Sequence, residues 1–127
     1  MHHTFKEPVW YGEAQDIDEK GNLVANEIKD KPTVCFVFAS WCPHCSNASP
    51  ALQEFAEKHA DKCNVVVFQS DGERQSEKDA VKKLSSSLSN FRGFPHFFGC
   101  NKNGNLSSEQ CNGRDLVSLE DFLQRLE

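Results

Sequence analysis

The chain of 127 residues is predicted to have an α/β fold, in which a mixed β-sheet is covered by helices on both faces. Residues 33–38 and 64–70 form short apolar runs, rich in β-branched and aromatic residues, that are typical of strands buried between two layers. A helix-length segment joins the two runs, which indicates a parallel pair. A third apolar run is followed by Asn103-Gly104, a turn signal that predicts an antiparallel hairpin.

The composition excludes several classes of protein. The formal net charge is −5, and a negatively charged domain repels phosphate backbones, so we expect no nucleic-acid partner. No apolar run approaches the roughly 18 residues that a bilayer-spanning helix needs. The N-terminal segment is polar and lacks the apolar core of a signal peptide, so we expect a cytoplasmic monomer that does not bind membranes.

We expect one domain over residues 1–127. A strand and helix region would cover residues 1–30, and a core that carries the chemistry would cover residues 31–127. Within the first region, residues 9–11 are typical of a short edge strand, and residues 14–30 have a loose helical pattern.

Residues 43–59 are predicted to form a helix, because apolar residues recur there at intervals of three or four positions on one face. Pro43 suits the first helical turn, where the backbone N–H has no partner in any case. Pro50 lies inside the same segment and should kink the helix.

The C-terminal half predicts two more helices and two more strands. Residues 71–90 are typical of a charged surface helix. The run GFPHFFGC predicts a third strand, and a fourth should extend from the Asn103-Gly104 turn to near Cys111. The last helix should be capped by Asp115 or Ser118. The side chains expected to face the core from these two helices are Val81, Leu84, Leu88, Leu119, Phe122, Leu123 and Leu126.

The motif WCPHC places Cys42 and Cys45 at the junction between a predicted strand and a predicted helix. Cys42 would lie at the helix N-terminus, where unpaired backbone N–H groups and the helix dipole stabilise an anionic thiolate. Cys45 would lie one turn inside the helix, where it should stay protonated longer. The spacing predicts an exposed nucleophile, Cys42, and a resolving partner, Cys45, that act through a mixed disulfide.

The two residues between the cysteines, Pro43 and His44, are predicted to tune the pair. A charged His44 would stabilise the thiolate, and with it the reduced form of the protein. A more stable reduced form makes a stronger oxidant. We therefore expect a redox potential above that of a dithiol with glycine and proline between its cysteines.

With three further segments, the motif resembles the thioredoxin superfamily. Pro50 falls where members of the family kink the active-site helix, and RGFPHFF resembles the family's segment with a cis-proline facing the site. NKNG, followed by Gly113, resembles the final hairpin and turn. The resemblance covers roughly residues 30–126. It implies a thioredoxin fold, with a central mixed sheet flanked by helices on both faces.

The resemblance also implies roles for individual residues. Cys42 and Cys45 would form the redox-active disulfide. Pro95 would be the cis-proline, and it would frame a groove for extended peptide substrates together with Trp41 and Phe94.

Two positions depart from the family pattern. Phe36 stands where thioredoxins carry a buried aspartate that helps to move the proton of the resolving cysteine. Val67 or Phe68 stands where a lysine coupled to that acid is usual. Our hypothesis is that His44 or His96 takes part of the aspartate's role.

These observations predict a protein thiol–disulfide oxidoreductase. We expect it to need no organic cofactor and no metal, because the dithiol itself carries the electrons. Its partners would be protein or peptide disulfides and dithiols, and a reductase or oxidase that recycles the pair. The dipeptide between the cysteines resembles that of bacterial periplasmic disulfide oxidants, whereas a cytoplasmic location favours reduction, so the direction of electron flow stays open.

Two alternatives belong to other classes of protein. A non-catalytic binding module of the same fold would hold a partner in the same groove. A lone CxxC is often half of a zinc site, although the chain has no second CxxC. A disulfide between Cys100 and Cys111 is disfavoured, because Cys100 should face Ser107 across the predicted hairpin. The cysteines predicted to be free or packing thiols are Cys35, Cys63, Cys100 and Cys111.

Overall fold

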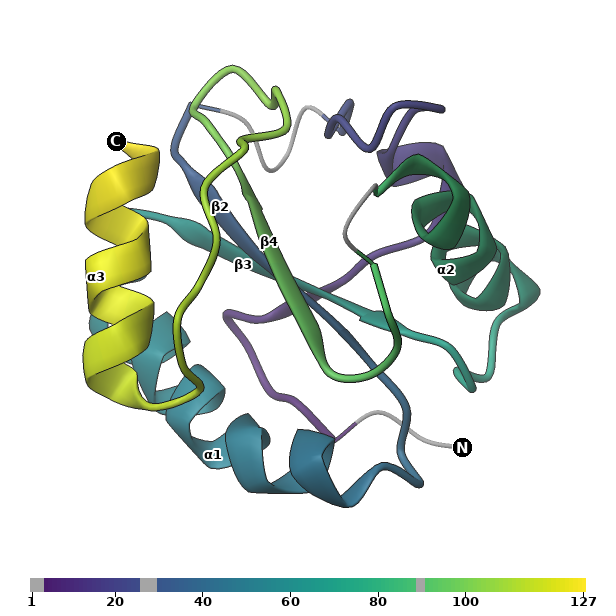
Figure 1. Ribbon diagram of the computed structural model, residues 1–127, viewed down its shortest axis with the longest axis horizontal. Helices are drawn as coiled ribbons and strands as arrows, with labels where there is room; N and C mark the ends of the chain where they lie inside the picture. The colour runs from purple at the N-terminus through teal and green to yellow at the C-terminus, as the bar shows by residue number, and fades with distance from the viewer. Residues whose placement is uncertain (1–3, 26–29, 89–90) are drawn as a thin grey trace.

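The structure, a computed structural model, describes residues 4–25, 30–88 and 91–127. Figure 1 shows a twisted sheet through the centre of the molecule, with α1 and α3 on its left and α2 on its right. In chain order, the elements are β1 (Trp10–Tyr11), the 3-10 turn η1 (Ala14–Asp16), β2 (Thr33–Phe38), α1 (Pro43–Lys58), β3 (Asn64–Gln69), α2 (Gln75–Ser87), β4 (His96–Cys100) and α3 (Leu116–Leu126).

The sheet in the described residues has four strands in the spatial order β1-β3-β2-β4. β3 runs parallel to β1 and to β2, whereas β4 runs antiparallel to β2. The predicted mixed sheet is confirmed, as are the parallel pair joined by α1 and the short edge strand near the N-terminus. The antiparallel partner of β4 is the central strand β2, so the edge strand β4 pairs with a strand from a distant part of the chain.

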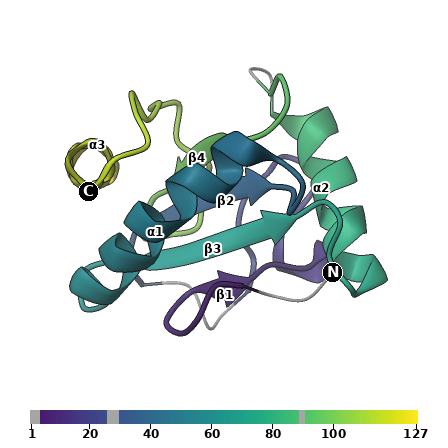
Figure 2. The same cartoon turned by 90° about the horizontal axis from the view of Figure 1, so that it is seen from below.

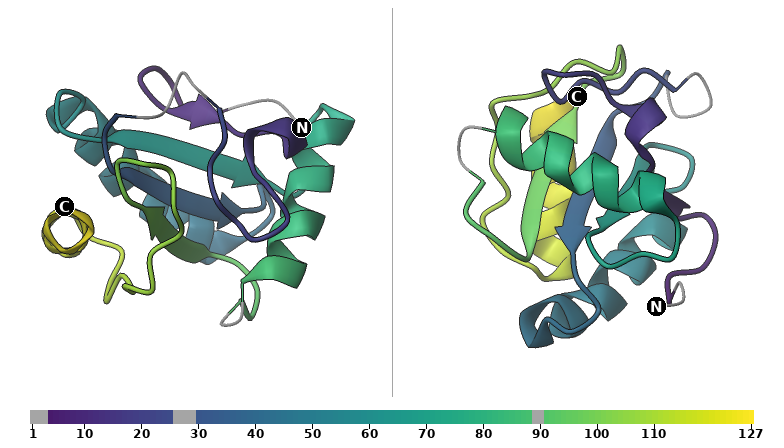
Figure 3. Two further views of the ribbon diagram at one scale, coloured as in Figure 1. Left: turned by 90° about the horizontal axis from the view of Figure 1, so that it is seen from above. Right: turned by 90° about the vertical axis from the view of Figure 1, so that its right-hand side faces the viewer.

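Helices cover both faces of the sheet, as predicted. Phe36 and Phe38 of β2 pack into the core beneath α1 and α3, whereas Cys35 and Val37 pack into the core beneath α2. Figures 2 and 3 show α1 and α3 on one side of the sheet and α2 on the other. Because successive strand residues point to opposite faces, a strand covered on both sides must be apolar throughout, and all six residues of β2 are buried.

The helix predicted over residues 14–30 is wrong in the part that the structure describes. Only Ala14–Asp16 form one 3-10 turn. The chain then reverses, and Ile17 pairs with Leu23 in an antiparallel bridge. Residues 26–29 of this prediction lie outside the described residues.

Local side-chain chemistry explains why the helix stops. The carboxylate of Asp18 accepts hydrogen bonds from the backbone N–H groups of Lys20 and Asn22, both at 2.9 Å. Such bonds compete with the helical pattern. Gly21 has φ of 87°, a left-handed conformation that glycine adopts without steric cost and that reverses the chain.

The turn predicted at Asn103-Gly104 is present, and its glycine has φ of 86°. The fourth strand predicted to run from this turn to near Cys111 is wrong. A single antiparallel bridge joins Cys100 to Leu106, and no ladder follows it in the described residues. Cys100 is thus paired with Leu106 rather than with Ser107.

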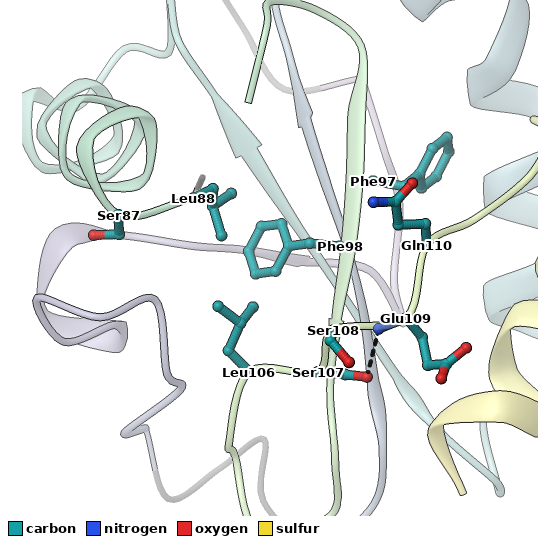
Figure 4. Close-up of a pocket in the computed structure, with 9 residues that line it drawn as sticks. All are labelled: Ser87, Leu88, Phe97, Phe98, Leu106, Ser107, Ser108, Glu109 and Gln110. Carbon is teal, nitrogen blue, oxygen red and sulfur yellow. Dashed lines mark hydrogen bonds between the residues drawn. The ribbon is translucent and has the colours of Figure 1, made fainter. Parts of the chain in front are cut away.

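The segment after the turn is held by the N-terminal region as well as by β4, where the backbone N–H of Ser107 donates to the carbonyl of Gly99 at 2.9 Å. The backbone N–H of Leu106 donates to the side chain of Asn22 at 2.8 Å, and the backbone N–H of Leu23 donates to the carbonyl of Gly104 at 2.8 Å. Figure 4 shows a pocket lined by residues 106–110, by Phe97 and Phe98 of β4, and by Ser87 and Leu88 at the end of α2. The expected hairpin ladder is therefore reduced to one bridge, and contacts with the N-terminal region hold the segment in addition.

The other helices agree with their sequence patterns. Asp115 caps α3 by accepting the backbone N–H of Ser118 at 3.0 Å, so the cap is Asp115. Pro43 is the first residue of α1, and Pro50 lies inside it, while the kink at Pro50 stays a prediction. The seven core-facing residues predicted on α2 and α3 are buried in α2, in its C-cap or in α3: Val81, Leu84, Leu88, Leu119, Phe122, Leu123 and Leu126.

Within the described ranges, no helix is long and apolar enough to cross a membrane. The cytoplasmic location, the monomeric state and the single domain over residues 1–127 stay predictions, and so does the division into residues 1–30 and 31–127.

Gly12 shows how closely the N-terminal segment packs on the sheet. A Cβ added at Gly12 would lie 2.3 Å from Cε1 of Phe68. Phe68 is fully buried, and its ring stacks on that of Phe98 with the centroids 6.0 Å apart. The backbone N–H of Gly12 is bonded to the carbonyl of Val67 at 2.8 Å, which holds the two segments together.

Replacing Gly12 by alanine should therefore lower the free energy of unfolding by about 1–3 kcal/mol, the usual cost of forcing an extra group into a packed core. Urea unfolding measures this change. In a Phe68→Leu background the ring is gone, and the same substitution should cost less. Equal costs in the two backgrounds would contradict the steric explanation.

Candidate active site

Cys42 lies at the junction between β2 and the first turn of α1. It is the residue that caps α1, and Pro43 occupies the first helical position. The backbone N–H of Cys45 donates a hydrogen bond to Sγ of Cys42 at 3.2 Å. The sulfur of Cys42 therefore lies at the positive end of the helix dipole, among backbone N–H groups that have no partner within the helix.

The exposure predicted for Cys42 is wrong. Only 4% of Cys42 is exposed, compared with 1% of Cys45. The reason is the capping geometry, because the sulfur turns back over the first helical turn and into the core beneath α1, where Phe94 packs beside it. The two thiols thus differ in their hydrogen bonding far more than in their burial.

Cys45 is held as a neutral thiol. Burial first, and then the contact with Cys42, raise the pKa of Cys45, which stands at about 12. The backbone of Ala39 and the charge of Arg114 act in the opposite direction and offset part of this increase. At neutral pH, Cys45 is therefore protonated, as the sequence predicted for the resolving position.

An aromatic surface frames the mouth of the site. Trp41 is 68% exposed, and its ring meets that of Phe94 edge-on with the centroids 6.0 Å apart. Phe91 contacts the other side of Phe94, also with centroids 6.0 Å apart. The Phe94-Pro95 peptide bond is cis, as predicted. The three residues predicted to frame a groove, Trp41, Phe94 and Pro95, therefore lie together next to the dithiol.

The two candidate histidines lie in different places. His44 is exposed in the first turn of α1, beside Cys42 and Cys45. His96 pairs with Val37 across the sheet and contacts the ring of Phe91, 5.2 Å away between centroids. Because Val37 faces α2 and cross-strand partners share a face, His96 lies on the face opposite α1.

This placement separates His96 from the resolving thiol. Burial lowers the pKa of His96, so it is neutral near pH 7, and its Nε2 makes no hydrogen bond among the described residues. The sheet lies between its ring and Cys45. The geometry therefore gives His96 no direct path to the proton of Cys45.

The position of the missing aspartate is filled by an aromatic cluster. Phe36 is fully buried, and its ring lies 5.3 Å from that of Phe38 and 4.8 Å from that of Phe97, measured between centroids. The sheet beneath α1 is therefore apolar at this point, and it offers no carboxylate to accept the proton of Cys45.

Sequence reasoning missed a polar contact that positions the segment before the motif. The carboxylate of Asp71 accepts the backbone N–H of Ser40 at 3.0 Å and also bonds the hydroxyl of Ser40. Burial raises the pKa of Asp71, but the hydrogen bonds from Ser40 and from Gln69 outweigh it, so the net pKa is lowered. The sequence could have indicated this contact, because Ser40 and Asp71 each follow one of two parallel strands. The carboxyl ends of parallel strands meet at one edge of the sheet.

Sequence reasoning also missed Arg114. It follows Gly113, the residue that resembles the family's final turn, and its charge lowers the pKa of Cys45 across the site. Arg114 lines one pocket together with Arg92, Pro95 and His96. Only the fold reveals that Arg114 acts on Cys45, because the two residues are far apart in the chain.

The remaining cysteines are packing or free thiols. All six cysteines are unbridged. Burial raises the pKa of Cys35, and contact with Cys100 adds to this effect, while burial raises the pKa of Cys63 to about 12. Cys111 is half-buried, with Sγ 3.1 Å from the carbonyl oxygen of Gly113. In the part of the chain that the structure describes, no three histidine, cysteine or acidic side chains form a metal-binding group.

Comparison with known proteins shows which family this chain belongs to. The family model described as thioredoxin matches residues 18–125. The chain therefore belongs to the thioredoxin family, a family of thiol–disulfide oxidoreductases, and its predicted resemblance to that superfamily is confirmed.

Individual relatives agree with this assignment. The chain is 33% identical over 104 residues to a thioredoxin-like protein, 453L, of Invertebrate iridescent virus 6, covering 73% of this chain and 75% of that protein. It is 32% identical over 96 residues to the protein disulfide-isomerase erp38 of Neurospora crassa, covering 73% of this chain and 24% of the isomerase. The chain thus spans about a quarter of the isomerase's length.

Solved structures show the same fold. The Trx4 domain of ERdj5 is 14% identical, with a TM-score of 0.68, and the match covers 94% of this chain and 96% of that one. Thioredoxin of Fasciola hepatica is 22% identical, with a TM-score of 0.60, and the match covers 80% of this chain and 86% of that one. The thioredoxin fold predicted from the sequence is therefore confirmed.

The raised pKa of Cys45 predicts how the stability of the reduced protein depends on pH. Above about pH 9 an unfolded chain loses the Cys45 proton, whereas the folded protein keeps it until about pH 12. Folding stability from this thiol is therefore fully present below about pH 9 and is lost as the pH rises toward 12.

The Cys45→Ala variant should accordingly lose stability less steeply than the wild type above about pH 9, as measured by urea unfolding under reducing conditions. Between about pH 6 and pH 8 the two proteins should show the same slope, because Cys45 is protonated in both states there. Parallel curves above pH 9 would show that burial does not hold the proton of Cys45.

Proposed function

We propose that the chain exchanges disulfides with other proteins through the Cys42–Cys45 dithiol, as a protein thiol–disulfide oxidoreductase. The observation that carries this proposal is the hydrogen bond of 3.2 Å from the backbone N–H of Cys45 to Sγ of Cys42 at the start of α1. It joins one sulfur at the helix N-terminus to a second thiol held neutral by burial.

The reaction needs only these two sulfurs. The Cys42 thiolate attacks one sulfur of a substrate disulfide, which forms a mixed disulfide and releases the other substrate sulfur as a thiolate that takes up a proton. Cys45 then loses its proton and attacks the sulfur of Cys42, which forms the Cys42–Cys45 disulfide and releases the second substrate thiol. Two electrons and two protons pass to the substrate, and the reverse sequence oxidises a substrate dithiol.

The resolving step sets the main chemical demand on this site. Cys45 must give up its proton although burial raises its pKa to about 12 and Phe36 provides no carboxylate as acceptor. In this proposal the positive charge of Arg114 lowers that cost, and the exposed His44 beside the pair accepts the proton when its imidazole is neutral. Pro43 and His44 together set the redox potential, while His96 has no direct part because it lies on the other face of the sheet.

The substrate in this proposal is an extended segment of a protein or peptide that carries a disulfide or a dithiol. Trp41, Phe94 and Pro95 provide the surface on which it lies, and the exposed ring of Trp41 is free to cover it. A separate reductase or oxidase recycles the pair. The direction of electron flow follows from the potential of the pair relative to its compartment.

The exposed Trp41 also favours the second candidate, a binding module that holds a partner without turnover. Reduction of insulin disulfides and oxidative refolding of a reduced substrate separate the two. Cys42→Ser should abolish turnover in both assays, because the attacking sulfur is gone. Cys45→Ser should accumulate a mixed disulfide at Cys42 that a non-reducing gel detects.

Cys63→Ala is the matched control for these two variants, because it removes a buried thiol outside the site and should leave turnover unchanged. Wild-type protein that binds a substrate but never turns it over would support the binding module and contradict the proposed reaction.

The midpoint potential of the pair should lie above the value of about −270 mV typical of thioredoxin, because a charged His44 stabilises the reduced form. His44→Gln should lower it by roughly 15–30 mV, which corresponds to a three- to tenfold change in the equilibrium constant. Equilibration in glutathione buffers with thiol trapping measures both values.

Lys62→Gln serves as the control for the potential, because it removes an exposed positive charge beyond the far end of α1. A wild-type potential at the thioredoxin value, or one that His44→Gln leaves unchanged, would show that His44 does not tune the pair.

A further inference from the structure

Two of the four arginines in the chain are paired with carboxylates, and two are not. Arg74 lies against Glu77 and 2.7 Å from Glu13, and Arg125 lies 3.0 Å from Glu109 and 3.1 Å from Asp121.

Arg92 and Arg114 behave differently. Neither makes an ion pair or a side-chain hydrogen bond within residues 4–25, 30–88 and 91–127, and both are exposed. They come from separate loops, one before the cis-proline Pro95 and one before α3, yet they line the same pocket. The fold has therefore brought the two uncompensated guanidinium groups to the edge of the groove beside Pro95.

No acidic side chain lines this pocket. Glu109, on the segment that leads into it, is bound by Arg125 at 3.0 Å. Asp115, next to Arg114 in the chain, is engaged in capping α3, where it accepts the N–H of Ser118 at 3.0 Å. The positive charge is thus local, although the chain as a whole carries −5. Because exposed charges are screened within about 8 Å at physiological ionic strength, a ligand in the groove experiences these two arginines more than the distant net charge.

The groove is also close to the reacting sulfurs. The charge of Arg114 lowers the pKa of Cys45, so the two groups interact electrostatically across the site. Phe94, which precedes Pro95, packs against the core cluster that contains Cys42 and Cys45. An extended segment bonded to Cys42 through its own cysteine would therefore pass close to the two arginines.

We propose that Arg92 and Arg114 form a recognition site for acidic segments, and that the substrates of this chain carry aspartate or glutamate within a few residues of the reacting cysteine. This inference rests on the disulfide-exchange function proposed above. Guanidinium groups bind carboxylates through paired N–H donors, which supplies both attraction and orientation. The arginines thereby select among substrates, in addition to the effect of Arg114 on the proton of Cys45, and the preference between two peptides isolates the selection.

The test compares two peptides that share one sequence and one disulfide, with glutamates flanking the cysteine in the first and glutamines in the second. Stopped-flow measurement gives the second-order rate constant for their reduction by wild-type protein and by Arg92→Gln/Arg114→Gln. Wild type should prefer the acidic peptide by roughly three- to tenfold at low ionic strength, because each exposed ion pair contributes little by itself. The double variant should lose this preference, and high salt should reduce it in the wild type.

Lys62→Gln/Lys82→Gln is the matched control, because it removes two exposed positive charges away from the groove and changes the net charge equally. It should keep the preference for the acidic peptide. Equal rates for the two peptides with wild type, or a preference that survives in the arginine variant, would overturn the inference and leave the proposed function intact. No exchange with either peptide would instead overturn the proposed function, and the inference with it.

Discussion

The structure depends on one junction, where the carboxyl end of β2 meets the amino end of α1 and Cys42 caps the helix. The backbone N–H of Cys45 donates to the sulfur of Cys42, so the geometry that starts the helix also joins the two thiols. This junction holds only because β2 is buried on both faces and Asp71 ties Ser40 to the end of β3. The sheet thus fixes where the helix begins, and the helix fixes where the sulfurs lie.

The burial of the pair gives this site its particular chemistry. Both sulfur-bearing residues are almost fully covered, and the sheet beneath them presents Phe36 and Phe38 in place of a titratable group. The apolar surroundings raise the pKa of Cys45 and hold it as a neutral thiol, so the two cysteines differ in chemical character. In the proposed reaction, the same surroundings make deprotonation of Cys45 the demanding step, so the nearby positive charge of Arg114 would matter more than it would beside a carboxylate.

In the two proposals above, the surface around the junction would provide two kinds of recognition. Trp41 and Phe94 form an aromatic surface that would accept any extended segment, whereas Arg92 and Arg114 would provide charge beside Pro95. Apolar contact and backbone bonding supply affinity with little selectivity, and charge complementarity supplies selectivity with little affinity. This chain would combine both kinds of recognition, because it has a net charge of −5 and yet leaves two arginines uncompensated beside its groove.

The sequence by itself determined the parallel strands, the three helices, the position of the dithiol and the identity of Pro95, because these depend on local periodicity, on capping at Cys42 and on a motif of fixed spacing. It did not determine the loss of the fourth strand, because the segment around Leu106 is bonded to Asn22, which is distant in the chain. The reversal at Gly21 has local causes, the hydrogen bonds to Asp18 and the positive φ of Gly21, which the loose helical periodicity of residues 14–30 did not indicate. The tertiary structure alone decided the burial of Cys42, the face on which His96 lies and the meeting of Arg92 with Arg114. Each of these is a relation between residues far apart in sequence, and only the packing of the sheet and its helices brings such residues together.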